Sequence, residues 1–119
     1  MREISERERE RYQRNLLVDG FGEQGQSRLL ESRVTVVGAG GLGSAVLNYL
    51  VAAGVGHIRI VESDTVSPSN LQRQVLYTTA EIGALKAEAA AARLSRLNPG
   101  CRLEIVAERL TAANASERL

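Results

Sequence analysis

The stretch VTVVGAGGLGSAVLNYL, from Val34 to Leu50, constrains the fold of this chain more than any other. A β-branched run at its start predicts a buried strand over Arg33–Val37, and the apolar residues after the glycines predict a helix over Leu42–Ala53. Between them, GAGGLG fits the pattern G-x-G-x-x-G in the strand–turn–helix context that this motif requires. Backbone N–H groups at such a helix start attract anions, so a phosphate-binding α/β fold is the first expectation.

The chain beyond this point continues to alternate between predicted helices and strands. A strand is expected over His57–Val61, an alanine-rich helix over Ala84–Leu97 and a third strand over Leu103–Val106. This order implies parallel strands with right-handed crossovers. The predicted fold class is therefore α/β, a Rossmann-like doubly wound parallel sheet represented by its first βαβαβ half. We assign residues 33–119 to this nucleotide-binding half-domain.

Residues 1–32 are predicted to form an N-terminal helical arm that precedes the sheet. The segment SERE, which starts at Ser5, has the form of a capping box and predicts a helix that begins near Glu6. Glycines at positions 20, 22 and 25 then interrupt the helical pattern. A second short helix is expected over Gln26–Ser32.

Composition and charge argue against several classes of function. The 119 residues have a net charge of +1, so we expect no electrostatic preference for nucleic acid or for a membrane surface. The single cysteine, Cys101, cannot form an internal disulfide or a cysteine-rich zinc site, and Tyr77 is expected to pack rather than to react. No apolar run approaches the roughly 18 residues of a membrane span, and the charged start is unlike a signal peptide. A cytoplasmic protein is expected.

The glycines of the motif have distinct expected roles. Gly38 permits the tight turn, Gly40 removes a side chain where the backbone must approach phosphate, and Gly43 lets the helix pack on the strand. An acidic residue about 20 positions further on usually holds a ribose hydroxyl. Glu62 and Asp64 lie 19 and 21 residues after Gly43. Taken alone, this spacing indicates NAD, so the cofactor domain of an oxidoreductase is one open hypothesis.

The connection after the second strand favours a different ligand. Ser69–Gln74 reads SNLQRQ and places polar side chains at the carboxyl end of the strands, where ligands of this fold bind. Lys86, close to the predicted start of the next helix, is the only lysine among 15 basic residues. Its compact charge on a long stem suits a phosphate. An ordinary surface lysine is the alternative on composition alone.

Taken together, these motifs resemble the ThiF/MoeB family of bacterial adenylyltransferases, which are related to ubiquitin-activating enzymes. The resemblance runs from about Arg11 to Leu110 and is most specific in the NLQRQ segment and in the position of Lys86. The segments that carry it are RYQR (11–14), GFG (20–22), GAGGLG (38–43), AGVG (53–56), SNLQRQ (69–74), IG (82–83) and Lys86.

The resemblance implies ATP, with Mg²⁺, rather than NAD. It implies ATP-dependent adenylylation of the C-terminal glycine carboxylate of a ubiquitin-like sulfur-carrier protein, in sulfur transfer of the molybdopterin or thiamine type. The residues it implies at the nucleotide are Gly38, Gly40, Gly41, Gly43, Glu62, Asp64, Asn70, Arg73 and Lys86. The implied catalytic residues are Arg14, Arg73 and Lys86. A homodimer is also implied, in which Arg14 reaches the partner's site; without the family, Arg14 is simply a charge on a solvated helix.

Two features depart from the family pattern. Glu62 stands where the family usually has aspartate, and one extra methylene shifts a carboxylate by about an ångström. The family's metal-binding aspartate, Cys-x-x-Cys zinc pair and carrier-binding groove are not found in these residues. We therefore expect the N-terminal half of an adenylyltransferase, inactive alone, whose first strand has one unpaired edge. A non-catalytic nucleotide-binding or dimerisation fragment is the second alternative.

Overall fold

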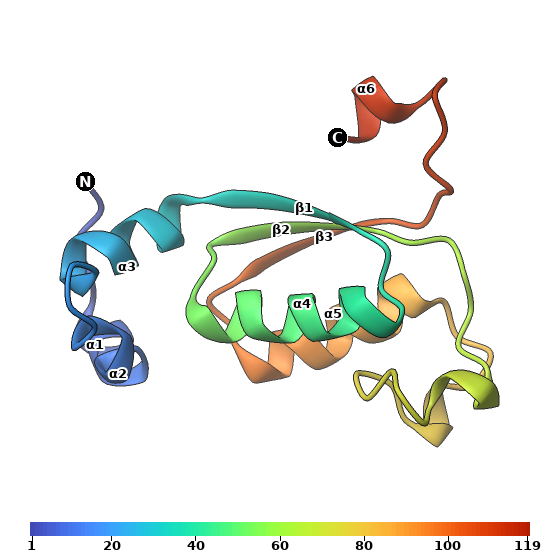
Figure 1. Ribbon diagram of the computed structural model, residues 1–119, viewed down its shortest axis with the longest axis horizontal. Coiled ribbons are helices and arrows are strands. Elements are labelled where there is room, and N and C mark those ends of the chain that lie inside the picture. Colours follow the sequence, from blue (N-terminus) through green and yellow to red (C-terminus); the bar gives the residue numbers. More distant parts are fainter.

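The computed structural model describes residues 1–119 and contains one three-stranded parallel sheet with helices packed against it (Figure 1). β1 (Arg33–Val37) pairs with β2 (His57–Val61), which in turn pairs with β3 (Arg102–Val106), both in parallel. The strand order β1-β2-β3, with a helix in each crossover, confirms the predicted α/β fold class. The outer edge of β1 has no partner strand, as expected.

The helices of the two crossovers, α4 (Gly41–Ala53) and α5 (Lys86–Leu97), lie on the same face of the sheet (Figure 1). Val36 of β1 and Ile60 of β2 are neighbours in the sheet and are both buried on this face. Each aliphatic side chain buried in this way stabilises the fold by about 1.5–3 kcal/mol. The core that results includes Val36, Leu47, Val51, Ile58, Ile60, Ala90 and Leu94.

The element boundaries lie close to the predicted ones. α4 begins one residue early, at Gly41, and ends at Ala53 as predicted; Gly54, with a left-handed φ of 104°, is the expected helix C-cap. α5 begins at Lys86, two residues later than predicted, because Leu85 is extended and forms an antiparallel bridge with Thr65. No helix combines the length and the apolar character that crossing a lipid bilayer requires.

Three helices form the N-terminal arm: α1 (Glu6–Arg11), α2 (Gln13–Leu16) and α3 (Gly22–Glu31). Ser5 caps α1 through the predicted capping box with Glu8. The prediction of a helix over 26–32 was wrong at its start, since α3 begins at Gly22. Gly25 lies inside α3 instead of interrupting it, because the ring of Phe21 occupies the space that a side chain at this position would fill.

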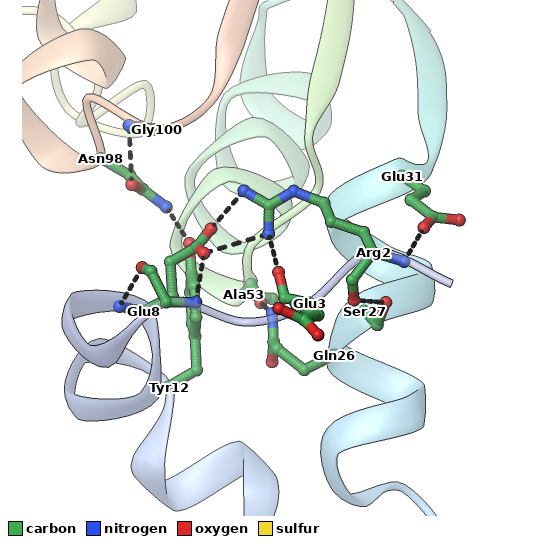
Figure 2. A network of polar contacts seen from close by, with 11 residues as sticks. Arg2, Glu3, Glu8, Tyr12, Gln26, Ser27, Glu31, Ala53, Asn98 and Gly100 are labelled. Carbon is green, nitrogen blue, oxygen red and sulfur yellow. Dashed lines mark hydrogen bonds and ion pairs between the residues drawn. The ribbon is translucent and has the colours of Figure 1, made fainter.

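Amide side chains attach the arm to the C-terminal end of α4 (Figure 2). Asn98 Nδ2 donates to Tyr12 Oη at 2.8 Å and to the Val51 carbonyl at 2.9 Å. Gln26 Nε2 donates to the Ala53 carbonyl at 2.9 Å. Both carbonyls belong to the last turn of α4, and that of Val51 also accepts from the N–H of the capping residue Gly54 at 3.2 Å. The arm and Asn98 therefore add side-chain donors at the end of the helix that follows the glycine loop.

The opposite face of the sheet is polar. Thr35, Arg59 and Glu104 lie side by side in the strand register, and Arg59 Nη2 donates to Glu104 Oε1 at 3.1 Å. Arg59 Nη1 also donates to the Arg118 carbonyl at 2.9 Å. That contact holds a short C-terminal helix, α6 (Ala115–Arg118), on this side of the sheet (Figure 1).

We predict that Asn98→Ala lowers the free energy of unfolding by about 1–3 kcal/mol, because it removes the buried amide that donates to both the Tyr12 hydroxyl and the Val51 carbonyl. The matched control is Asn48→Ala on α4, where the half-buried side chain has no such contact and alanine favours the helix. Urea denaturation measures the free energy of unfolding of both variants. Equal losses in the two variants would contradict the role assigned to Asn98.

Candidate functional site

The candidate site lies at the carboxyl end of the strands. The glycine loop, residues 38–40, joins β1 to α4 there, and the long connection from β2 to α5 runs past the same end (Figure 1). Two 3₁₀ turns lie in this connection: η1 (Pro68–Asn70) and η2 (Thr79–Glu81). Parallel α/β sheets bind their ligands in this position.

Two glycines set the path of the loop. Gly38 has a φ of 95°, which a residue with a side chain rarely adopts. A Cβ at Gly43 would overlap the carbonyl oxygen of Gly38. The first turn of α4 therefore packs directly on the end of β1, as predicted for this glycine.

Both backbone polar groups of Ala39 form hydrogen bonds with side chains. Its N–H donates to Glu62 Oε1 at 2.8 Å, and its carbonyl accepts from Tyr77 Oη at 2.6 Å. Burial, followed by the charges of Glu62 and Glu81, raises the pKa of Tyr77, so its hydroxyl remains a donor. The expectation that Tyr77 only packs was incomplete, since no sequence pattern shows where a buried hydroxyl will point.

Glu62 organises the ends of two strands. Its Oε2 accepts from the N–H groups of Ser63 at 2.9 Å and Asp64 at 3.0 Å, in addition to the Ala39 bond at Oε1. Burial acts to raise the pKa of Glu62, but the three N–H bonds and the charge of Lys86 outweigh it and hold the pKa below its usual value. The carboxylate is therefore ionised at neutral pH, and Oε1 retains a lone pair for one more donor.

Lys86 is buried, with 5% of its surface exposed, so the alternative of an ordinary surface lysine was wrong. The backbone N–H of Lys86 donates to the Asp64 carbonyl at 2.9 Å, beside the bridge between Thr65 and Leu85. These contacts bring the first residue of α5 to the end of β2. No carboxylate lies within ion-pair distance of its ammonium group. A lysine side chain that is mostly buried and has no carboxylate partner favours an anionic ligand at its ammonium group.

Arg73 and Asn70 occupy the same turn but have different contacts. Arg73 is exposed, and its Nε lies 3.9 Å from the position that a Cβ at Gly41 would take. Asn70 Oδ1 accepts from the N–H and hydroxyl of Ser67, both at 3.0 Å, and so caps η1. The structure therefore brings Arg73, Glu62 and Lys86 close to the glycine loop. The side-chain oxygen of Asn70, in contrast, is occupied by its hydrogen bonds from Ser67.

The remaining predicted residues lie further out. Asp64 is exposed, and no cluster of three or more acidic, histidine or cysteine side chains is present that could hold a metal ion. Arg14 lies on α2, in the arm that packs on the C-terminal end of α4. The 13 residues of α4 separate that end from the glycine loop by about 20 Å. Arg14 is therefore not part of the site in its own chain.

We predict that Glu62→Gln lowers the free energy of unfolding by about 1.5–3 kcal/mol at pH 7, because it disrupts hydrogen bonds to an ionised group. The folded pKa lies below the unfolded value of about 4.3, so the carboxylate stabilises the fold above that pH and less as the pH falls through the folded pKa. The difference in the free energy of unfolding between wild type and variant should therefore be smaller at pH 3 than at pH 7.

Urea denaturation at both pH values measures this difference, with Glu88→Gln on the exposed side of α5 as the control. A difference that stays constant with pH, or that the control reproduces, would contradict the assignment.

Comparison with known proteins identifies relatives that match most of this chain. Sulfur carrier protein adenylyltransferase of Thermus thermophilus is 54% identical over 112 residues, which are 94% of this chain and 41% of that protein. SAMP-activating enzyme E1 of Haloferax volcanii is 48% identical over 108 residues, 91% of this chain and 40% of that protein. The chain thus spans less than half the length of either relative.

Solved structures show the same fold. Escherichia coli tRNA N6-threonylcarbamoyladenosine dehydratase, TcdA, superposes with a TM-score of 0.90 in its complex with AMP and 0.89 in its complex with ATP. The sequence identities are 30% and 31%, the matches cover 98% and 96% of this chain, and they cover 47% and 46% of TcdA. The ThiF family pattern itself matches residues 12–119. The chain therefore belongs to the ThiF family.

Proposed function

We propose that this chain is the ATP-binding half of an adenylyltransferase that activates the C-terminal glycine carboxylate of a ubiquitin-like sulfur carrier of the molybdopterin or thiamine type. The observation that carries the proposal is the mostly buried Lys86 side chain, whose ammonium group has no carboxylate partner and whose charge acts on Glu62, the carboxylate bound to the glycine loop. The names of the relatives and the TcdA complexes with ATP and AMP support this choice of nucleotide and reaction.

The residues at the loop fit a nucleotide phosphate. No side chain caps the N-terminus of α4, so its first N–H groups are free to bind an anion. In the proposal, the phosphate groups lie against the glycines of the loop, namely Gly38, Gly40, Gly41 and Gly43. Arg73 and Lys86 would neutralise the phosphate charge, and the amide nitrogen of Asn70 would donate a hydrogen bond. Glu62 would accept a ribose hydroxyl through the free lone pair of Oε1.

The proposed reaction is nucleophilic attack of the carrier carboxylate on the α-phosphorus of ATP. The bond from the α-phosphorus to the bridging oxygen breaks, and pyrophosphate leaves. Both reactants are anions, so the protein accelerates the step mainly by positioning them and by compensating negative charge. The Lys86 ammonium would be effective here because bound substrates would exclude water, and a lower dielectric strengthens its interaction with phosphate.

Three further assignments belong to the same proposal. Mg²⁺ would accompany ATP and be bound largely by the phosphates and water, with Asp64 as the nearby carboxylate. Arg14 would act across a homodimer, since in its own chain it lies at the far end of α4. We also propose that the reaction takes place in the cytoplasm.

We predict that the full-length protein that contains this half, given ATP, Mg²⁺ and a carrier ending in Gly-Gly, exchanges labelled pyrophosphate into ATP. Lys86→Ala should reduce this exchange at least tenfold, because loss of one charge in a closed site costs a few kcal/mol of transition-state stabilisation. Arg28→Ala, an exposed residue of α3, is the control and should exchange at the wild-type rate. An unchanged rate for Lys86→Ala would remove this residue from the mechanism.

A further inference from the structure

Gln74 is buried beside the glycine loop, although neither its burial nor its contacts follow from the polar motif that contains it. Only 4% of its surface is exposed, whereas Gln72, two residues earlier in the same turn, is exposed. The backbone fixes its position, since Gln74 N–H donates to the Asn70 carbonyl at 2.8 Å and its own carbonyl accepts from Tyr77 N–H at 3.2 Å.

The carboxamide of Gln74 faces the start of α4. Its Nε2 lies 3.6 Å from the position that a Cβ at Gly40 would take. Gly40 is the N-cap residue of α4, and Arg73 has the equivalent position over Gly41. The two consecutive side chains therefore border the place where the free N–H groups of the helix would bind an anion, one of them charged and the other neutral.

The other end of the carboxamide is not satisfied by the protein. Gln74 Oε1 is fully buried and has no hydrogen-bond donor. A buried oxygen in this state costs free energy, and an apolar side chain of the same shape would avoid the cost. Packing alone thus does not explain a glutamine at this position. Unsatisfied groups of this kind occur where a function requires the polar group.

We propose that Gln74 is a nucleotide-binding residue whose Nε2 donates to the phosphate bound over Gly40. The inference rests on the proposed binding of ATP at this loop. A neutral donor adds direction without adding charge, so Gln74 would orient the phosphate while Arg73 and Lys86 compensate its charge. The unpaired Oε1 is the stability cost of keeping the nitrogen turned toward the loop.

The test compares Gln74→Met with Gln72→Met in the purified protein. Methionine keeps the length and volume of glutamine and removes both polar atoms, so Gln74→Met should unfold at the same or a higher temperature than wild type. Its affinity for ATP should fall about tenfold, which is about 1.4 kcal/mol, while its affinity for adenosine, which has no phosphate, should stay the same. Gln72→Met should change neither affinity. Isothermal titration calorimetry with ATP and with adenosine provides the affinities.

Gln74→Glu provides a second, independent variant. It keeps the shape but replaces the donor by an anionic acceptor, so its loss of ATP affinity should exceed that of Gln74→Met, again without a comparable loss for adenosine. Equal losses for ATP and adenosine, an unchanged ATP affinity, or a Gln74→Met protein that fails to fold would each overturn the assignment of Gln74. Absence of ATP binding in wild type would instead overturn the proposed function.

Discussion

The carboxylate of Glu62 is the interaction on which the site depends. It binds the Ala39 N–H of the glycine loop and two successive N–H groups after β2, and so joins the ends of two neighbouring strands. Tyr77 fixes the same loop through the Ala39 carbonyl. Because the polar groups of Ala39 are already paired, the N–H groups left for a ligand are those of the first turn of α4. The protein thus arranges the anion site before any ligand binds, which is what preorganised charge stabilisation requires.

Helix α4 connects this site to the arm. Its N-terminus borders the proposed phosphate site, and carbonyls of its last turn accept from Gln26 of the arm and from Asn98 at the end of α5. A short helix with both ends fixed is a rigid spacer. It holds the arm, and with it Arg14, at a set distance from its own glycine loop. The arrangement is consistent with a role for Arg14 in the site of another subunit, as proposed above.

The sequence allowed most of the fold to be predicted, because β-branched runs, the glycine motif and the alanine-rich segment each have a clear period or context. It failed where tertiary contacts decide the outcome. The helix over Gly22–Glu31 includes a glycine because Phe21 packs over it, and Lys86 is buried because Thr65 pairs with Leu85. Tyr77 and Gln74 reach the loop from a segment without periodicity. Only the three-dimensional path of the chain brings them there, so the sequence analysis did not expect either side chain at the glycine loop.

The central claim is that this loop binds ATP rather than NAD, although Glu62 lies at the spacing typical of NAD-binding folds. A ligand that binds only the native state raises the unfolding temperature by an amount that grows with the logarithm of its concentration above the Kd. The most direct test is therefore a parallel calorimetric titration of the purified protein with ATP and with NAD, checked by the thermal shift that each ligand produces. The account predicts binding and stabilisation by ATP and neither effect with NAD. Stabilisation by NAD without binding of ATP would contradict it.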